Sequence, residues 1–271
     1  MKIDFFCPRW GSEDLSWEAF CQNVSSAGYD GFEVGIAQTT IDAEFQEIWN
    51  TAEKYKLQII IQHYDTYEAN FEKHYDLYCA WLEKIKALPC VKINSQTGKD
   101  FFSLAQNSSL IEAALKVSHQ TGTQIVHETH RNKFSFAAHV TKQYLEKIPD
   151  LTLTLDISHW VCVSESYLED QQKTVQLAID RTGHFHARVG YPCGPQVPDP
   201  RVQEWQHAVN VHLNWWDKIV ERKKKEQCAI TITPEFGPYP YMVHIPGTST
   251  PICNQWDVNV YMMELLRKRY S

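Results

Sequence analysis

Residues 151–160, LTLTLDISHW, decide how the rest of the chain is interpreted. Leucines alternate with threonines over the first five positions, which is typical of a β-strand. The apolar run then stops at Asp156, and His159 follows three residues later. Since a buried strand has no packing reason to end in a carboxylate, we expect these two side chains to serve chemistry. The purely structural alternatives are that Asp156 caps the next turn and that His159 fills space in a loop.

Three other apolar segments also deliver a carboxylate or an imidazole. TQIVHETH (123–130) carries Glu128, HFHARVG (184–190) carries His184 and His186, and CAITITPEFG (228–237) carries Glu235. Carboxylate oxygens and imidazole nitrogens are common ligands of divalent metal ions in proteins. Four strands that place such groups at the same end predict one shared site.

Strand and helix patterns alternate along the whole chain. We predict strands at 3–7, 31–35, 57–63, 91–94, 123–129, 151–157, 185–189 and 229–234, and helices at 15–27, 42–56, 68–88, 109–121, 136–148, 168–181, 205–225 and 255–269. Eight such units in 271 residues, with no linker between them, predict a single (β/α)8 TIM-barrel domain spanning 1–271. A doubly wound open sheet is the alternative, but Pro8-Arg9-Trp10-Gly11 after the first strand does not match its glycine-rich phosphate turn.

A TIM barrel carries its active site at the carboxyl ends of its strands. Glu128, Asp156, His186 and Glu235 all fall at or near such ends, so we expect them to converge on one divalent ion. Three carboxylates and an imidazole suit Mn, Zn, Co or Fe equally well, whereas acidic oxygens alone would suit Mg. His184 shares the face of His186 because side chains alternate along a strand, and it is the second choice as ligand.

Three more residues are expected to contact a substrate at the same mouth. His63 ends the strand at 57–63, Glu33 lies inside the strand at 31–35, and Arg188 has the same strand parity as His186. For His63 a satisfied core histidine fits equally well. Two proline-bearing loops, 190–201 and 237–251, follow strands and should shape lids over this side.

Composition and charge restrict the cellular location and the partners that we expect for this protein. The formal net charge of −7 argues against nucleic acid as a partner. The start of the sequence does not look like a signal peptide, and no apolar run reaches the roughly 18 residues of a membrane span. The eight cysteines are scattered and form no CxxC pair, as expected for reduced thiols. We therefore expect a cytoplasmic protein with no membrane partner.

Taken together, these residues resemble the xylose isomerase-like TIM barrels. The resemblance rests on Glu after the fifth strand, Asp-x-x-His after the sixth, His-x-His on the seventh and Glu after the eighth, and it covers the whole chain. It is closest to the sugar phosphate isomerase/epimerase group, which also includes dehydratases and endonuclease IV. That group implies one divalent metal at Glu128, Asp156, His186 and Glu235, with Glu128 and Glu235 also acting as the catalytic acid/base pair. His159 would hold a substrate oxygen.

The resemblance implies a metal-dependent isomerase or epimerase of a small sugar, keto-sugar or polyol that works through an enediolate. A dehydratase (lyase) on the same scaffold and a non-catalytic carbohydrate-binding barrel are the alternatives, and a homo-oligomer is compatible with the group. Tyr191-Pro192-Cys193-Gly194 stands where the epimerases carry an arginine. Asn94 and Asp199-Pro200-Arg201 replace ligands of the three-zinc endonucleases, which together with the negative charge argues against a nuclease.

Overall fold

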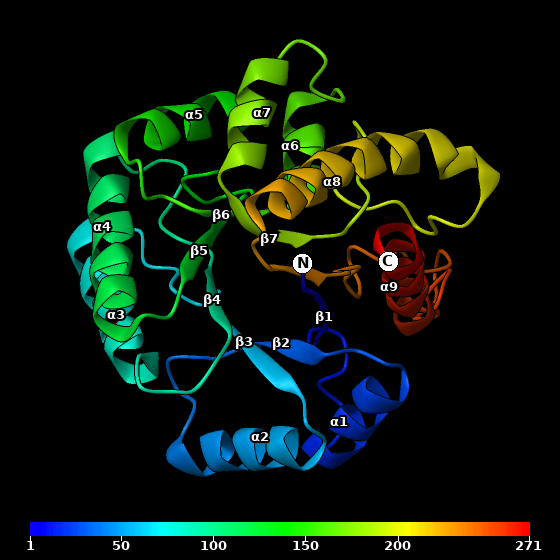
Figure 1. Ribbon diagram of the computed structural model, residues 1–271, viewed down its shortest axis with the longest axis horizontal. Coiled ribbons are helices and arrows are strands. Elements are labelled where there is room, and N and C mark those ends of the chain that lie inside the picture. The colour runs from blue at the N-terminus through cyan, green and yellow to red at the C-terminus, as the bar shows by residue number, and fades with distance from the viewer.

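Eight parallel strands close into a barrel in sequence order, surrounded by helices (Figure 1), in a computed structural model that describes residues 1–271. The predicted (β/α)8 TIM barrel is confirmed. The strands are β1 (Ile3–Pro8), β2 (Gly31–Gly35), β3 (Gln58–His63), β4 (Lys92–Ser95), β5 (Ile125–Glu128), β6 (Leu153–Leu155), β7 (Thr182–His186) and β8 (Ile230–Thr233). The helices are α1 (Trp17–Ser26), α2 (Asp42–Lys54), α3 (Phe71–Ile85), α4 (Leu104–Thr121), α5 (Ala138–Lys147), α6 (Ile157–Ser164), α7 (Gln172–Asp180), α8 (Gln206–Glu226) and α9 (Gln255–Tyr270), with a short 3-10 turn, Gln203–Trp205, before α8.

The apolar core lies between the strands and the surrounding helices. It is one continuous cluster of 60 buried residues, and its largest side chains are Trp81, Trp160 and Trp216. Several helices begin at a side-chain cap, such as the Ser103 hydroxyl that accepts from the backbone N–H of Gln106 at the start of α4. Burial of this cluster is the main term that stabilises the barrel.

The inside of the barrel is polar. Lys92 of β4 donates a hydrogen bond of 3.0 Å to the Thr231 hydroxyl of β8, and Asn94 of β4 donates one of 2.8 Å to Glu33 of β2. These pairs join strands that are not neighbours in the sheet, so the side chains cross the barrel interior. Buried polar groups persist only where they find such partners. The hydrogen-bonded side chains of the interior therefore support the side chains at the carboxyl end of the barrel.

Two predicted strands differ most from the observed ones. The strand expected at 185–189 runs from Thr182 to His186, because Gly183, which we expected to end the preceding helix, belongs to β7. A Cβ at Gly183 would lie 2.7 Å from Thr152 Cγ2 and 3.1 Å from Val126 Cγ1, so glycine allows the strands to approach. The strand expected at 151–157 shortens to Leu153–Leu155, since Asp156 caps the additional helix α6 and accepts from the Ser158 backbone N–H at 3.1 Å.

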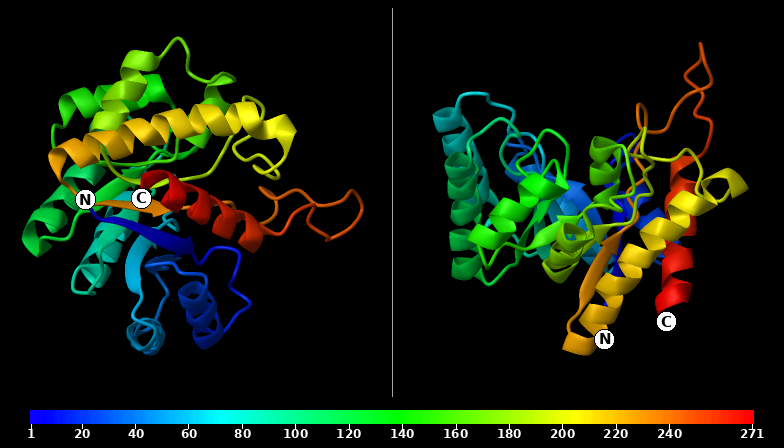
Figure 2. Two further views of the ribbon diagram at one scale, coloured as in Figure 1. Left: turned by 45° about the vertical axis from the view of Figure 1, so that its right-hand side comes forward. Right: turned by 90° about the horizontal axis from the view of Figure 1, so that it is seen from above.

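The long loop 237–251 projects from the end of the barrel opposite to the two chain termini (Figure 2). It is joined to the other long loop, 190–201, by two hydrogen bonds between Gln196 and Gly237. Both loops therefore lie on the carboxyl side of the strands, as expected. None of the helices has the length and apolar character needed to span a bilayer.

Candidate metal centre

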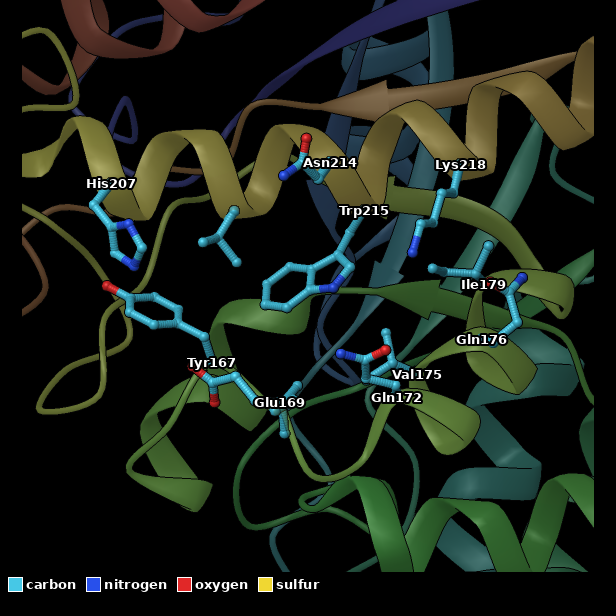
Figure 3. Close-up of a pocket in the computed structure, with 12 residues that line it drawn as sticks. Tyr167, Glu169, Gln172, Val175, Gln176, Ile179, His207, Asn214, Trp215 and Lys218 are labelled. Atoms are coloured by element: carbon cyan, nitrogen blue, oxygen red, sulfur yellow. The ribbon is translucent and has the colours of Figure 1, made fainter.

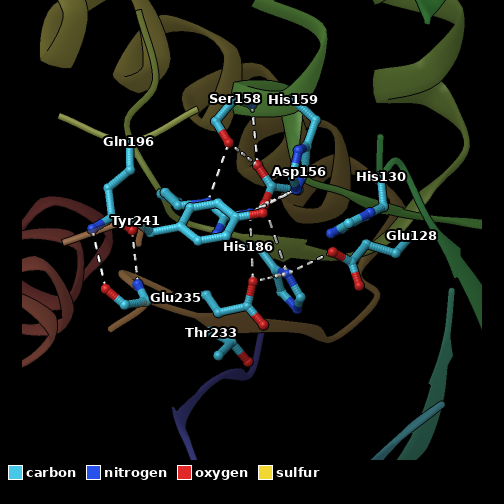
Figure 4. Close-up of polar contacts among 12 residues, drawn as sticks. Glu128, His130, Asp156, Ser158, His159, His186, Gln196, Thr233, Glu235 and Tyr241 are labelled. Carbon is cyan, nitrogen blue, oxygen red and sulfur yellow. Dashed lines mark hydrogen bonds and ion pairs between the residues drawn. The ribbon is translucent and has the colours of Figure 1, made fainter. Parts of the chain in front are cut away.

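The four predicted ligands meet at the carboxyl end of the barrel. Glu128 ends β5, Asp156 follows β6, His186 ends β7 and Glu235 lies just after β8. All four are buried, and they offer donor atoms that lie within 4.8 Å of one another. Figure 4 shows the three carboxylates around the imidazole. Neighbouring parallel strands place their last side chains side by side, which is why residues spread over more than 100 positions share one site.

The His186 imidazole has a different neighbour on each nitrogen. Its Nδ1 lies 2.9 Å from Glu235 Oε2, 3.6 Å from Glu128 Oε1 and 3.9 Å from Asp156 Oδ2. Its Nε2 lies 3.2 Å from both carboxylate oxygens of Glu33, below the cluster. The Nε2–H can therefore donate to Glu33 and leave Nδ1 free to bind an ion.

Glu33 is itself held from several directions. Thr233 donates a hydrogen bond of 2.6 Å to its carboxylate, and the His184 Nε2 lies 3.2 Å away. Burial acts to raise the pKa of Glu33, but His186 and His184 outweigh it and hold the pKa well below its usual range. Glu33 thus stays anionic and anchors both histidines of β7. Its carboxylate turns to those rings and does not line the cavity described below.

The pKa values of two buried carboxylates of the cluster, those of Glu235 and Glu128, are shifted in opposite directions. Burial raises the pKa of Glu235, although His186 opposes the shift. At Glu128 burial also acts upward, but His186 outweighs it and lowers the pKa to about 2. For His186 burial acts downward, and the charges of Glu235, Glu33 and Glu128 overcome it and raise the pKa well above its usual value. The pocket therefore attracts positive charge.

The donor set fits a divalent metal ion. Two buried atoms of the cluster, Glu128 Oε1 and His186 Nδ1, have no hydrogen-bond partner. Three carboxylates stand against one guanidinium, that of Arg188, so a dication would balance the cluster when His186 is neutral. Oxygen donors with one imidazole suit Mn, Zn, Co, Fe or Mg without selecting among them.

Arg188 and His159 form the wall of the site next to Asp156. As its strand parity predicted, Arg188 points inward; it forms an ion pair with Asp156 and lies 2.8 Å from His159 Nε2. On the other side of the ring, Arg131 Nε lies 3.1 Å from His159 Nδ1. Burial and then the surrounding His130 and arginines lower the pKa of His159 well below its usual value. The role of His159 in holding a substrate oxygen stays a prediction.

His63 lies apart from the four ligands. It ends β3, is fully buried, and its Nε2 lies 2.8 Å from the Thr66 hydroxyl. Its ring packs against Tyr78 and Trp81, with ring centroids 4.9 Å and 4.6 Å away. These contacts fit a packed core histidine, although its Nδ1 has no hydrogen-bond partner, and its contact with a substrate stays a prediction.

A cavity of about 720 Å³ opens beside the cluster. Glu235 and Arg188 line it together with residues that the sequence analysis did not single out, chiefly Arg9, Trp10, Trp17, Gln62, Tyr64, Tyr67, Gln96, His130, Lys133 and Tyr241. Gln62 lies 3.3 Å from Glu235 and Gln96 lies 3.2 Å from Glu128, so each amide can donate to one of the two glutamates. Several of these residues follow β3, β4 or β5 directly. Their place directly after a strand could have marked them in the sequence as candidates for the site.

A second, smaller cavity of about 330 Å³ lies outside the barrel (Figure 3). It is formed between α7 and α8, with Trp215 and His207 on one side and Tyr167 on the other. It contains none of the three groups of side chains that could hold a metal. The carboxyl end of the barrel is therefore the candidate functional site.

Comparisons with known proteins bear on the fold. No protein-family model matches the chain, and no curated protein sequence matches it. Among solved structures, AsbF from Bacillus anthracis, described as a probable 3-DHS dehydratase involved in petrobactin synthesis, superposes with a TM-score of 0.57 at 16% identity, covering 99% of this chain and 100% of that one. A protein from Anabaena variabilis named as a sugar phosphate isomerase/epimerase gives a TM-score of 0.61 at 11% identity, covering 99% and 98%. The structure named AsfvAP:AG gives 0.55 at 14% identity, covering 99% of both chains.

These likenesses establish the fold. The chain is a TIM barrel whose closed eight-stranded architecture matches that of the Anabaena variabilis protein over nearly its full length. The comparisons thereby confirm the TIM-barrel fold that the resemblance to xylose isomerase-like barrels implied.

Proposed function

We propose that this protein is a divalent-metal-dependent isomerase or epimerase of a small sugar, keto-sugar or polyol, with Glu128 and Glu235 as its acid/base pair. The observation that carries the proposal is the convergence of Glu128, Asp156, His186 and Glu235 beside a cavity large enough for a small sugar. These four residues would hold the ion. When bound, such an ion polarises a substrate carbonyl oxygen and stabilises the negative charge that develops on it.

The two glutamates would carry the proton. One carboxylate removes the proton from the carbon next to the carbonyl, and the electron pair moves toward the carbonyl oxygen to give an enediolate. Return of a proton to the former carbonyl carbon, with transfer of the hydroxyl proton between the two oxygens, completes an isomerisation, and return to the opposite face of the first carbon completes an epimerisation. Gln96 and Gln62 can donate to Glu128 and Glu235, which fixes the orientation of each carboxylate, and Glu235 lines the cavity.

A dehydratase is the second candidate, because one of the structures with the same fold is described as a dehydratase. The first step would be the same proton removal beside a carbonyl. The enediolate would then expel a hydroxyl group from the next carbon as a carbon–carbon double bond forms, and a protonated glutamate would give this group the proton with which it leaves as water. The two candidates differ in product, since only the lyase releases an unsaturated carbonyl compound.

The test is deuterium exchange at carbon. Metal-loaded protein is incubated with a panel of ketoses and polyols in D2O, and NMR follows deuterium at carbon, new epimers and unsaturated products. Glu128→Gln and Glu235→Gln should each reduce turnover by about 10²- to 10⁴-fold, the usual contribution of a positioned acid or base. Glu53→Gln, at an exposed position of α2, serves as the matched control. A sugar that binds wild-type protein without exchange or conversion would instead favour a carbohydrate-binding barrel.

A further inference from the structure

Two buried lysines, Lys133 in the cavity wall and Lys99 near it, form no ion pair. Lys133, in the connection between β5 and α5, is only 3% exposed, and its ammonium forms no hydrogen bond. Lys99, in the connection between β4 and α4, is 5% exposed. No carboxylate oxygen lies within 4.0 Å of the ammonium nitrogen of either lysine.

The other buried lysine and arginines each form at least one hydrogen bond or ion pair. Arg188 pairs with Asp156, Arg9 donates to the carbonyl oxygens of Glu13 and Leu15, and Lys92 donates to Gly183 and Thr231. Lys99 and Lys133 are the two exceptions. Because a buried charge without a partner is costly, a fold keeps such a pair only where something else compensates it.

The two lysines share one neighbourhood. The Lys99 and Lys133 ammonium groups lie 5.6 Å and 5.8 Å from the centroid of the Tyr67 ring, which is itself largely exposed. Burial lowers the pKa of Lys133 to about 8, and the charge of Lys99 adds to the shift. Lys133 therefore keeps most of its charge at neutral pH.

No acidic group near the lysines forms an ion pair with either ammonium. Asp65 accepts a hydrogen bond from the Gln38 backbone N–H at 2.8 Å, and Glu128 belongs to the metal cluster. The chain as a whole is acidic, with a net charge of −7, so the two cations are not part of a generally basic surface. Lys133 lies in the wall of the cavity that also contains Glu235 and Arg188, and Lys99 lies near Tyr67 of the same wall.

We propose that Lys133 and Lys99 bind the anionic group, a carboxylate or a phosphate, of an acidic substrate. The proposal rests on the sugar-converting function, since it names the class of its substrate. Lysine supplies a compact point charge that suits either anion. The same cavity joins Lys133 to Glu235, so a sugar acid or sugar phosphate can place its anion at the lysines and its carbonyl at the cluster.

The experiment compares three compounds with one carbon skeleton: gluconate, glucose 6-phosphate and neutral glucose. Isothermal titration calorimetry measures each against wild type, Lys133→Met, Lys99→Met and the control Lys225→Met, which is exposed on α8. We expect at least one anion to bind about tenfold or more tightly than glucose, because charged hydrogen bonds are strong. Lys133→Met should abolish that preference, Lys99→Met should reduce it, and Lys225→Met should keep it. Whichever anion depends on Lys133 identifies the recognised group.

Two further measurements distinguish anion binding by the lysines from the proposed sugar conversion and from a purely structural role. Titrations run on both metal-free and metal-loaded protein, so loss of metal or turnover with retained Lys133-dependent anion binding would refute the proposed function alone. Lys133→Met should also raise the melting temperature, because it removes an uncompensated buried charge, whereas a purely structural lysine would lower it. The proposal is overturned if no anion is preferred to glucose, or if the preference is the same in Lys133→Met and wild type.

Discussion

His186 stands between two sets of carboxylates, and this position explains how one imidazole can serve a metal. Glu33 lies at its Nε2 and the three cluster carboxylates at its Nδ1. A second carboxylate that accepts from a ligating histidine fixes the tautomer and the ring orientation. Because side chains alternate along β7, His184 and His186 could be predicted to lie on the same face of the strand. The partner Glu33 comes from 150 positions upstream, and only barrel closure brings it there.

Replacing Glu33 tests this arrangement. Glu33→Gln should weaken metal binding by about 10- to 100-fold, because the amide no longer offers two anionic oxygens to His186 Nε2–H. Competition with a metal-binding dye measures the affinity directly, without an activity assay. Glu53→Gln provides the control. An unchanged metal affinity in Glu33→Gln would show that His186 does not need this support.

His212 on α8, outside the metal cluster, leads to a prediction of how the stability of the protein depends on pH. Its Nδ1 lies 2.8 Å from the Ala208 carbonyl oxygen, and the Gly190 backbone N–H donates to its Nε2 at 3.2 Å. Burial lowers its pKa to about 4, so the unfolded state binds the proton more readily between pH 6.5 and pH 4. The stability from neutral His212 is therefore complete above pH 6.5 and is lost as the pH falls toward 4, by up to about 3 kcal/mol.

Urea unfolding of wild type and His212→Gln across this pH range checks the prediction. The variant should lose less stability than wild type between pH 6.5 and pH 4, because glutamine does not titrate. Parallel stability curves for the two proteins would mean that His212 does not contribute to the acid sensitivity.

At the scale of elements, the β5–β6–β7 region shows what local pattern could and could not predict. The alternation of leucine and threonine correctly located β6, but the strand has only three residues because Asp156 starts α6. The carboxylate that caps α6 also belongs to the cluster that could hold a metal, so the two interpretations of Asp156 were not exclusive. The role of Gly183 was predicted wrongly because it depends on Thr152, which directly precedes β6.

Gly183→Ala should destabilise the barrel by about 1–3 kcal/mol, the usual cost of overpacking. The new methyl group would lie 2.7 Å from Thr152 Cγ2, so β6 and β7 would have to separate. Chemical denaturation measures the loss. Adding Thr152→Ser removes the nearest clashing methyl and should restore part of the stability. A Gly183→Ala protein as stable as wild type would show that the strands adjust without cost.

At the scale of the whole molecule, the eightfold alternation of strands and helices was enough to predict the barrel. Barrel geometry then placed Glu128, Asp156, His186 and Glu235 together, since ligands at equivalent strand ends must converge. The cavity wall was not predictable in the same way. Lys133 and Tyr241 come from loops whose paths depend on tertiary contacts, such as those between Gln196 and Gly237.

The most direct test of the central claim is the metal content of the purified protein, measured by elemental analysis beside a Glu128→Gln/Glu235→Gln double variant. The account predicts about one divalent Mn, Zn, Co, Fe or Mg ion per wild-type chain and its loss from the double variant, because two of four ligands lose their charge. A wild-type protein that contains no metal, and whose melting temperature does not rise with any of these ions, would contradict the account.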